Sequence, residues 1–266
     1  MKIPKKIHYC WFGGAELPEL AIRCMASWEK YCPDYEIIRW DEKNSDLESC
    51  RFVREAYTAK KWAFVSDYMR LKVVEEHGGI YLDIDVELLK PLDLFLVHQG
   101  FMGFEQAKPY CVATGLGFGA VAHHPVIRKL MENYENTPFI KADGSFDMTP
   151  CPARDTIVLT SFGLKQNGLE QQIYDLVVYP PEVFSPISLL GEELFTQRTA
   201  SIHHFNASWV TPEQKHFIEI KSKLTRIFGV KAGGVLSMLY LVKQKGVLYS
   251  LHKIKTRLFK SIKSIK

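Results

Sequence analysis

Hydrophobic and polar positions in the first part of the chain switch between the periods of strands and helices. Residues 6–14 read as a strand that runs into a glycine loop, and apolar residues recur at helical spacing over residues 18–31. A second strand is predicted at residues 35–40 and ends at Asp41. A strand, a helix and a strand in this order indicate an α/β fold with a mostly parallel central sheet.

The longest helical pattern covers residues 51–77 and ends at Gly78 and Gly79, which predict a C-terminal cap. Asp67 and Arg70 lie three positions apart on it, so their side chains share one face with an apolar stripe. They form either a structural ion pair or a pair that holds a polar ligand. The spacing alone favours the structural pair, because charge pairs at this interval are common on helices.

Two carboxylates, Asp83 and Asp85, follow a short apolar segment that predicts a buried strand. Alternation along a strand would point both side chains to one side, where their like charges repel unless a cation compensates them. Mg²⁺ or Mn²⁺, held by carboxylates together with phosphate oxygens, would supply that charge. The bare D-x-D pattern is also common among solvated turn acids, so its setting decides its meaning.

The composition describes an ordinary globular protein of 266 residues, 47% hydrophobic and 24% charged, long enough to bury a full core. Its six cysteines include no C-x-x-C pair, so neither a zinc ribbon nor a redox motif is indicated. The glycines of residues 115–119 match neither a P-loop nor a dinucleotide fingerprint. The first residues lack the apolar stretch of a secretory signal, and we expect a cytoplasmic protein.

Charge divides the chain into two parts. Residues 214–266 contain 13 Lys and Arg against one acid, a net charge of +12, whereas the rest of the chain carries −8. We therefore expect a catalytic domain over residues 1–212 and a basic helical tail over residues 213–266. The tail's longest apolar run, residues 232–242, is about half of the roughly 20 residues that span a bilayer.

The last part of this tail has the pattern of an amphipathic helix with basic flanks, since its apolar residues from Val247 to Ile262 recur mostly at steps of three and four. Such a helix would bind an anionic membrane surface at the inner face of the cell membrane. The alternative is a helix that packs on the globule and leaves its lysines in solvent. The acidic globule argues against nucleic acid as a partner.

Four segments of the chain, spread over roughly residues 3–210, carry a further signal. They are Ile7-His8-Tyr9-Cys10-Trp11-Phe12-Gly13-Gly14, Ser66-Asp67-Tyr68-Met69-Arg70, Gly78-Gly79-Ile80-Tyr81-Leu82-Asp83-Ile84-Asp85 and His203-His204-Phe205-Asn206-Ala207-Ser208-Trp209. Together, and in this order, they resemble the DXD-containing glycosyltransferase family 32. That family includes yeast outer-chain α-mannosyltransferases, bacterial capsular and lipopolysaccharide sugar transferases and, more distantly, the glucosylating domains of clostridial toxins.

The resemblance implies a GT-A type nucleotide-sugar-binding fold, a nucleotide-sugar donor and retention of anomeric configuration. On the donor side it implies that Trp11 stacks on the nucleotide base. Asp67 and Arg70 would hold hydroxyls of the donor sugar, which reverses the preference drawn from their spacing. Asp83 would contact the ribose or the sugar and share the metal site.

On the phosphate side the resemblance implies a Mn²⁺ or Mg²⁺ ion bound by Asp85 and bridging the diphosphate. His204, or less strongly its neighbour His203, would complete this site. Ser208 and Trp209 would donate hydrogen bonds to phosphate. The expected activity is a metal-dependent, retaining sugar transfer to a saccharide or lipid-linked saccharide in surface polysaccharide synthesis.

Two other classes of protein fit parts of the pattern. Residues 82–86 also match the strand end of haloacid-dehalogenase-type phosphatases, in which Asp83 would be a nucleophile. That class normally begins with this strand, whereas here about 80 residues of strand and helix pattern precede it. The other alternative is a non-catalytic basic protein that binds membrane through its tail.

Overall fold

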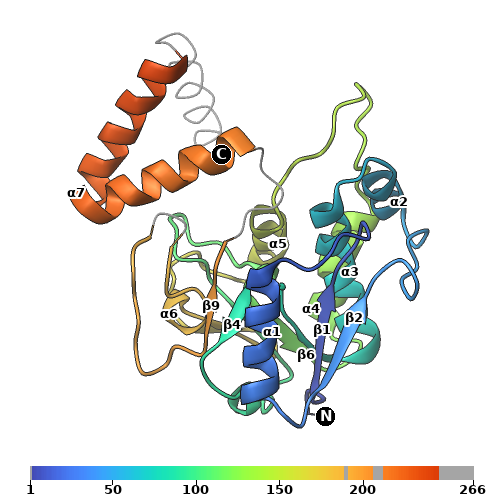
Figure 1. Ribbon diagram of the computed structural model, residues 1–266. Helices are drawn as coiled ribbons and strands as arrows, with labels where there is room; N and C mark the ends of the chain where they lie inside the picture. Colours follow the sequence, from blue (N-terminus) through green and yellow to red (C-terminus); the bar gives the residue numbers. More distant parts are fainter. Residues whose placement is uncertain (1, 189–190, 206–211, 246–266) are drawn as a thin grey trace. The chain divides into compact units, whose positions relative to one another are not determined.

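The computed structural model describes residues 2–188, 191–205 and 212–245, and these form two compact units (Figure 1). The first unit comprises residues 1–188 and 193–209, and the second comprises residues 189–192 and 210–266. The predicted tail segment of residues 247–262 lies outside the described residues, as do Ser208 and Trp209.

The first unit alternates helices and strands from its beginning, as the sequence pattern predicts. Its elements are β1 (Lys6–Cys10), α1 (Glu19–Tyr31), β2 (Glu36–Trp40), α2 (Arg51–Thr58), α3 (Trp62–His77), β3 (Gly79–Tyr81), β4 (Val86–Leu88), η1 (Asp93–Phe95), β5 (Gly100–Gly103), η2 (Thr114–Leu116), β6 (Phe118–Ala120), α4 (Pro125–Glu135), α5 (Cys151–Thr160), β7 (Gln171–Ile173), β8 (Leu176–Tyr179), α6 (Pro181–Phe184) and β9 (Ser201–His203).

Seven of these strands form one mixed sheet in the order β2-β1-β3-β6-β5-β8-β7. Strand β1 pairs parallel with both β2 and β3, while β6 lies antiparallel between β3 and β5. Five strands therefore run in one direction and β6 and β7 run against them. This confirms the predicted α/β class with a mostly parallel central sheet. Strands β4 and β9 form a separate antiparallel pair.

Apolar side chains cover both faces of the sheet, because successive residues of a strand point to opposite sides. On β3, Tyr81 joins a core cluster that also contains side chains of α2, α3, α4 and α5. Its neighbour Ile80 joins the other cluster, which contains Trp28 of α1 and side chains of η1 and α6. All three residues of β3 are accordingly buried.

The predicted helix over residues 51–77 is wrong in one respect, because it is two helices. Helix α2 ends at Thr58, and Lys60 adopts a left-handed conformation with φ 54°. The amide of Lys61 donates to the carbonyl of Ala56, and that of Lys60 donates to Tyr57. This is the Schellman arrangement that usually needs glycine, so the sequence carried no stop signal there. The predicted cap at Gly78 is confirmed: its φ is 62°, and its backbone N–H donates a hydrogen bond to the carbonyl of Val74.

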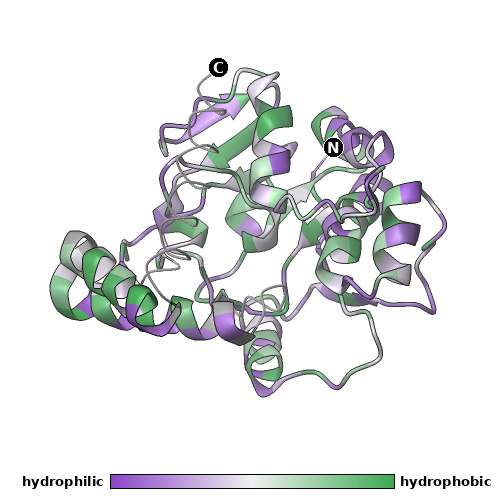
Figure 2. Ribbon diagram, turned by 90° about the horizontal axis from the view of Figure 1, so that it is seen from above, coloured by the Kyte–Doolittle hydropathy of each residue, from purple (hydrophilic) through white to green (hydrophobic). Residues whose placement is uncertain are grey.

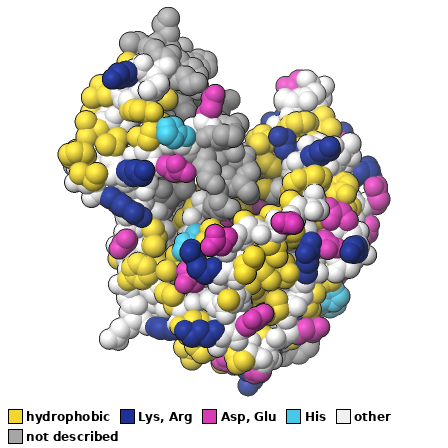
Figure 3. All heavy atoms as spheres, in the orientation of Figure 1, with side chains coloured by type: hydrophobic (Ala, Val, Ile, Leu, Met, Phe, Trp, Pro, Cys, Tyr) yellow, Lys and Arg dark blue, Asp and Glu magenta, His cyan; other side chains and the backbone are white. Residues whose placement is uncertain are grey.

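The second unit contains α7 (Pro212–Lys245), whose two helical arms meet at Gly229. Gly229 breaks the helical path with φ 76° and ψ 167°. Figure 2 shows hydrophobic and hydrophilic residues mixed along both arms, and Figure 3 shows apolar side chains gathered over the corner between them. No described helix is long and apolar enough to cross a membrane.

Candidate active site

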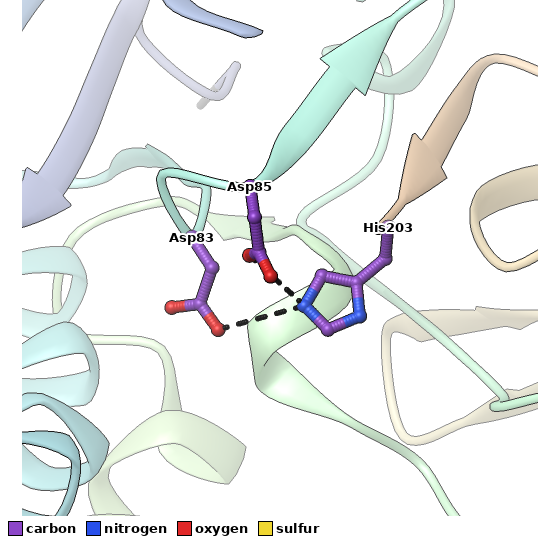
Figure 4. Close-up of side chains that lie close together, drawn as sticks. All are labelled: Asp83, Asp85 and His203. Carbon is purple, nitrogen blue, oxygen red and sulfur yellow. Dashed lines mark ion pairs between the residues drawn. The ribbon is translucent and has the colours of Figure 1, made fainter. Parts of the chain in front are cut away.

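The two aspartates of the D-x-D motif lie in a turn between β3 and β4. The amide of Val86 donates to the carbonyl of Asp83 over 3.0 Å, which closes the turn. Strand alternation, on which the sequence prediction relied, therefore does not orient these side chains. The turn itself brings the carboxylates of Asp83 and Asp85 to one place (Figure 4).

Strand β9 brings a histidine to the same place from far along the chain. Its pairing with β4 sets His203 opposite Val86, directly beside Asp85. The Nε2 atom of His203 lies 3.2 Å from Oδ1 of Asp85 and 3.9 Å from Oδ2 of Asp83 (Figure 4). One ligand atom of each residue lies within 4.8 Å of the others. We call Asp83, Asp85 and His203 the carboxylate–histidine cluster.

The sequence prediction chose His204 for this position, whereas the structure places His203 beside the two aspartates. Neighbouring residues of an extended segment point to opposite sides, so only one of the two histidines can face the aspartates. The Nε2 atom of His204 instead lies 2.8 Å from a carboxylate oxygen of Glu87. His204 still helps to position the site, because its amide donates to the carbonyl of Asp85 over 3.0 Å.

The charges of the cluster balance one another only in part. Burial alone would lower the pKa of His203, but the carboxylates of Asp85 and Asp83 outweigh it and raise that pKa. Burial raises the pKa of Asp83, opposed by Arg70 and reinforced by Asp85. A divalent cation would relieve the repulsion between the two acids, so the oxygen and nitrogen atoms present here fit such an ion.

Arg70 connects the predicted pair on α3 to the D-x-D motif. Its Nη2 atom lies 3.1 Å from Oδ1 of Asp67 and 3.1 Å from Oδ1 of Asp83. The hydroxyl of Tyr81 donates to that same Asp83 oxygen over 2.9 Å. The guanidinium is buried and its Nε donates to the carbonyl of Ser66. Asp67 and Arg70, which their spacing alone favoured as a structural ion pair, are thus part of one network with Asp83.

This network sets the ionisation of Asp67. Burial raises its pKa to about 6, with Asp83 adding to the increase and Arg70 opposing it. Arg70 stays charged, since Asp83 and Asp67 raise its pKa against the effect of burial. A carboxyl group with a pKa near neutral pH can accept hydrogen bonds from the hydroxyls of a sugar, and the guanidinium beside it can donate to them.

Gly115, on η2, is a site residue that sequence reasoning did not identify as such. A Cβ atom added to it would lie 2.4 Å from Oδ2 of Asp83 and 3.2 Å from Nη1 of Arg70. The sequence alone established only that the glycines of residues 115–119 match neither a P-loop nor a dinucleotide fingerprint. The structure shows that the backbone at Gly115 passes against the side chains of Asp83 and Arg70.

Asp155, on α5, is a second residue that the sequence analysis missed. It is 1% exposed and accepts a hydrogen bond from the hydroxyl of Thr114 over 2.9 Å. Its Oδ1 atom has no hydrogen-bond partner among the described residues. Burial raises the pKa of Asp155 to about 7, with Asp67 adding to the increase and Thr114 and Arg70 opposing it.

We expect Asp155→Asn to flatten the dependence of stability on pH. The pKa of Asp155 is about 7 in the folded protein and near 4 in the unfolded one. Between pH 4 and pH 7 unfolding therefore releases a proton, and the free energy of unfolding falls as the pH rises through this range. Between pH 5 and pH 7 the free energy of unfolding of the variant should therefore rise by roughly 2 kcal/mol relative to that of the parent. Urea unfolding at several pH values measures this. The exposed Asp143→Asn serves as control, and equal slopes for parent and Asp155→Asn would contradict the expectation.

Trp11 follows β1 at the same edge of the sheet at which Asp83 follows β3, since these strands are parallel neighbours. Its indole Nε1 donates to the carbonyl of Ala15 over 2.6 Å, and its amide donates to Trp40. The side chain is partly buried against the cluster that contains Trp28. The indole is therefore held in place while part of it remains accessible to a ligand.

Comparison with known proteins adds the following findings. Residues 18–102 match the family model described as "Glycosyltransferase sugar-binding region containing DXD motif". Inositol phosphoceramide mannosyltransferase 2 of Schizosaccharomyces pombe is 28% identical over 144 residues, covering 50% of this chain and 39% of that protein. The human alpha-1,4-N-acetylglucosaminyltransferase is 34% identical over 80 residues, covering 30% of this chain and 22% of that protein. The chain thus spans less than half the length of either relative.

Two solved structures match parts of this chain at low identity. The PaToxG glycosyltransferase is 20% identical, with a TM-score of 0.44 over 60% of this chain and 70% of that one. A glycosyltransferase involved in the glycosylation of the major capsid of PBCV-1 is 14% identical, with a TM-score of 0.43 over 80% of this chain and 98% of that one.

Proposed function

We propose that the protein, whose residues 18–102 match the DXD-containing sugar-binding region of glycosyltransferases, transfers a sugar from a nucleotide-sugar donor to a saccharide or lipid-linked saccharide. The observation that carries this proposal is the carboxylate–histidine cluster, joined through Arg70 to Asp67. A cation site and a sugar-binding pair in direct contact suit a substrate that has a diphosphate next to a sugar.

The cation that suits these donor atoms is Mn²⁺ or Mg²⁺, held by Asp85, Asp83 and His203. Carboxylates serve both ions, whereas an imidazole nitrogen is a better ligand for a transition metal, so the set favours Mn²⁺. When bound, the ion supplies Lewis-acid stabilisation of the charge that develops on the diphosphate.

The side chains of the protein itself hold and orient the donor. Asp67 and Arg70 bind hydroxyls of the sugar, and Tyr81 and Arg70 fix the carboxylate of Asp83 by hydrogen bonds and charge. We assign retention of configuration, with the acceptor hydroxyl attacking the anomeric carbon on the face that the phosphate leaves. The proton of that hydroxyl passes to the departing phosphate, so no covalent intermediate with a carboxylate is required.

The acceptor class that we propose is based on the name of one relative, and the proposed location is based on the charge of residues 214–266. One relative is named as a mannosyltransferase of inositol phosphoceramide, which is a lipid. A lipid-linked saccharide is accordingly the acceptor class we propose, used in surface polysaccharide synthesis. The net charge of +12 over residues 214–266 supports work at the anionic inner face of the cell membrane.

A phosphatase that uses Asp83 as nucleophile is the weaker candidate. One oxygen of Asp83 already accepts from Tyr81 and lies against Arg70, and the other faces His203. A nucleophile needs a free oxygen aimed at the reacting atom. Asp83 is better suited to bind a ligand than to attack one.

A panel of nucleotide sugars tests the proposed function. With Mn²⁺ present, the protein should release nucleoside diphosphate from one or a few donors, and EDTA should stop the release. Phosphate release from a simple ester, without nucleoside diphosphate release, would favour the phosphatase. Absence of both would support a protein that only binds.

A binding experiment tests the position of the base, because a stack between an indole and a base contributes roughly 1–3 kcal/mol to binding. On the nucleoside diphosphate released in the panel, Trp11→Ala should weaken binding by about 5- to 150-fold, and Trp11→Phe should weaken it less. Calorimetry measures both affinities. Equal affinities of parent and Trp11→Ala would remove Trp11 from the site.

A further inference from the structure

The corner of α7 exposes large apolar side chains on both of its arms. Ile227 and Phe228, which precede Gly229, are 70% and 53% exposed. Val235 and Leu239, which follow it, are 62% and 59% exposed and lie one helical turn apart on one face. We call these four residues the apolar corner. Figure 3 shows apolar side chains gathered over this part of α7.

The backbone holds the two arms of α7 close together at the corner. A Cβ atom added to Gly233 would lie 2.6 Å from both Cα and N of Thr225 on the other arm. Such an approach requires glycine, and the positive φ of Gly229 makes the sharp change of direction. The apolar corner is therefore presented by two tightly packed helix ends rather than by a loose loop.

Basic residues accompany the corner. Over residues 212–245 the sequence has seven Lys and Arg against two Glu. Arg226 directly precedes the apolar pair, Lys223 lies four residues before Ile227, and both are exposed. Apolar side chains with basic neighbours are the combination that binds the boundary between the headgroups and acyl chains of an anionic bilayer.

We propose that the apolar corner inserts into the surface of an anionic membrane, with Lys223 and Arg226 at the level of the headgroups. Since α7 is not apolar enough to cross a bilayer, the insertion is limited to the interface. A second copy of the chain fits the corner less well, because two such basic helices repel each other. The corner lies outside the carboxylate–histidine cluster, so this inference does not depend on the donor chemistry.

Binding to vesicles tests this inference on the full chain. Ile227→Ser combined with Phe228→Ser removes two large apolar side chains and leaves the charge unchanged. We expect at least a tenfold weaker partition onto phosphatidylcholine vesicles that contain phosphatidylglycerol, measured by flotation. The matched control is Ile22→Ser with Leu169→Ser, which removes two apolar side chains that are 59% and 64% exposed in the first unit. It should bind as the parent does.

Three results would overturn the insertion of the apolar corner. They are no binding of the parent to these vesicles, equal binding of parent and Ile227→Ser/Phe228→Ser, and a parent dimer in light scattering that the variant abolishes. Circular dichroism checks that the variant folds. Nucleoside diphosphate release without vesicles should be the same for both proteins, so a failure of the proposed function would be seen separately.

Discussion

Replacing Asp85 by Asn is expected to lower turnover by roughly 10³-fold, the scale of losing one main electrostatic contact to a developing charge. The amide keeps the size of the side chain but cannot offset the charge of a cation. The cluster with His203 and Asp83 would then bind the ion weakly. Nucleoside diphosphate release over a Mn²⁺ titration measures turnover, and calorimetry with Mn²⁺ alone measures affinity.

Glu87→Gln is the matched control, because it removes the same charge two residues along. Glu87 lies against His204 and takes no part in the carboxylate–histidine cluster. It should keep activity within a few-fold of the parent. If Asp85→Asn retained full turnover, or if EDTA left the parent fully active, the assigned cation site would be wrong.

Gly115→Ala should cost about 100-fold in activity although it adds a single methyl group. The new Cβ would meet Oδ2 of Asp83 at 2.4 Å, closer than atoms can approach, so that carboxylate must move. Displacing a site group by about 1 Å typically costs on the order of 10²-fold. The loss should appear in turnover and in Mn²⁺ affinity together, because Asp83 belongs to both the cluster and the Arg70 network.

The control for this substitution is Gly234→Ala, which also adds one methyl group to a glycine without positive φ. Nothing lies within 4 Å of its added Cβ, so activity in solution should not change. A Gly115→Ala enzyme as active as the parent would mean that Asp83 can move freely. The donor site would then tolerate more displacement than its buried contacts suggest.

The beginning of the central sheet was predictable because local pattern decides it. The strands Lys6–Cys10 and Glu36–Trp40 and the helix between them follow from periods of two and 3.6, which each segment satisfies alone. The end of α2 could not be predicted from the sequence, because Lys60 adopts a left-handed conformation that lysine seldom shows. A prediction from local sequence fails where tertiary packing selects a backbone conformation that is rare for the residue type.

Within the site, residue identity was easier to predict than geometry. The motif resemblance identified Asp67, Arg70, Asp83 and Asp85, and the structure brings these four side chains together. The choice between His203 and His204 depends on the register of β9 against β4, which no short segment of sequence specifies. Gly115 and Asp155 become visible only when η2 and α5 pack beside Arg70, a contact between segments distant in sequence.

The pairing of β4 with β9 has a consequence for how the active protein is made. Glu87 and His204 are 117 residues apart, so this pair closes the chain over a long loop. A ribosome has synthesised every strand of the seven-stranded sheet before His203 emerges. A nascent chain can therefore fold its sheet while it still lacks the histidine of the cluster. The chain would therefore acquire its full affinity for the cation only after β9 has been synthesised.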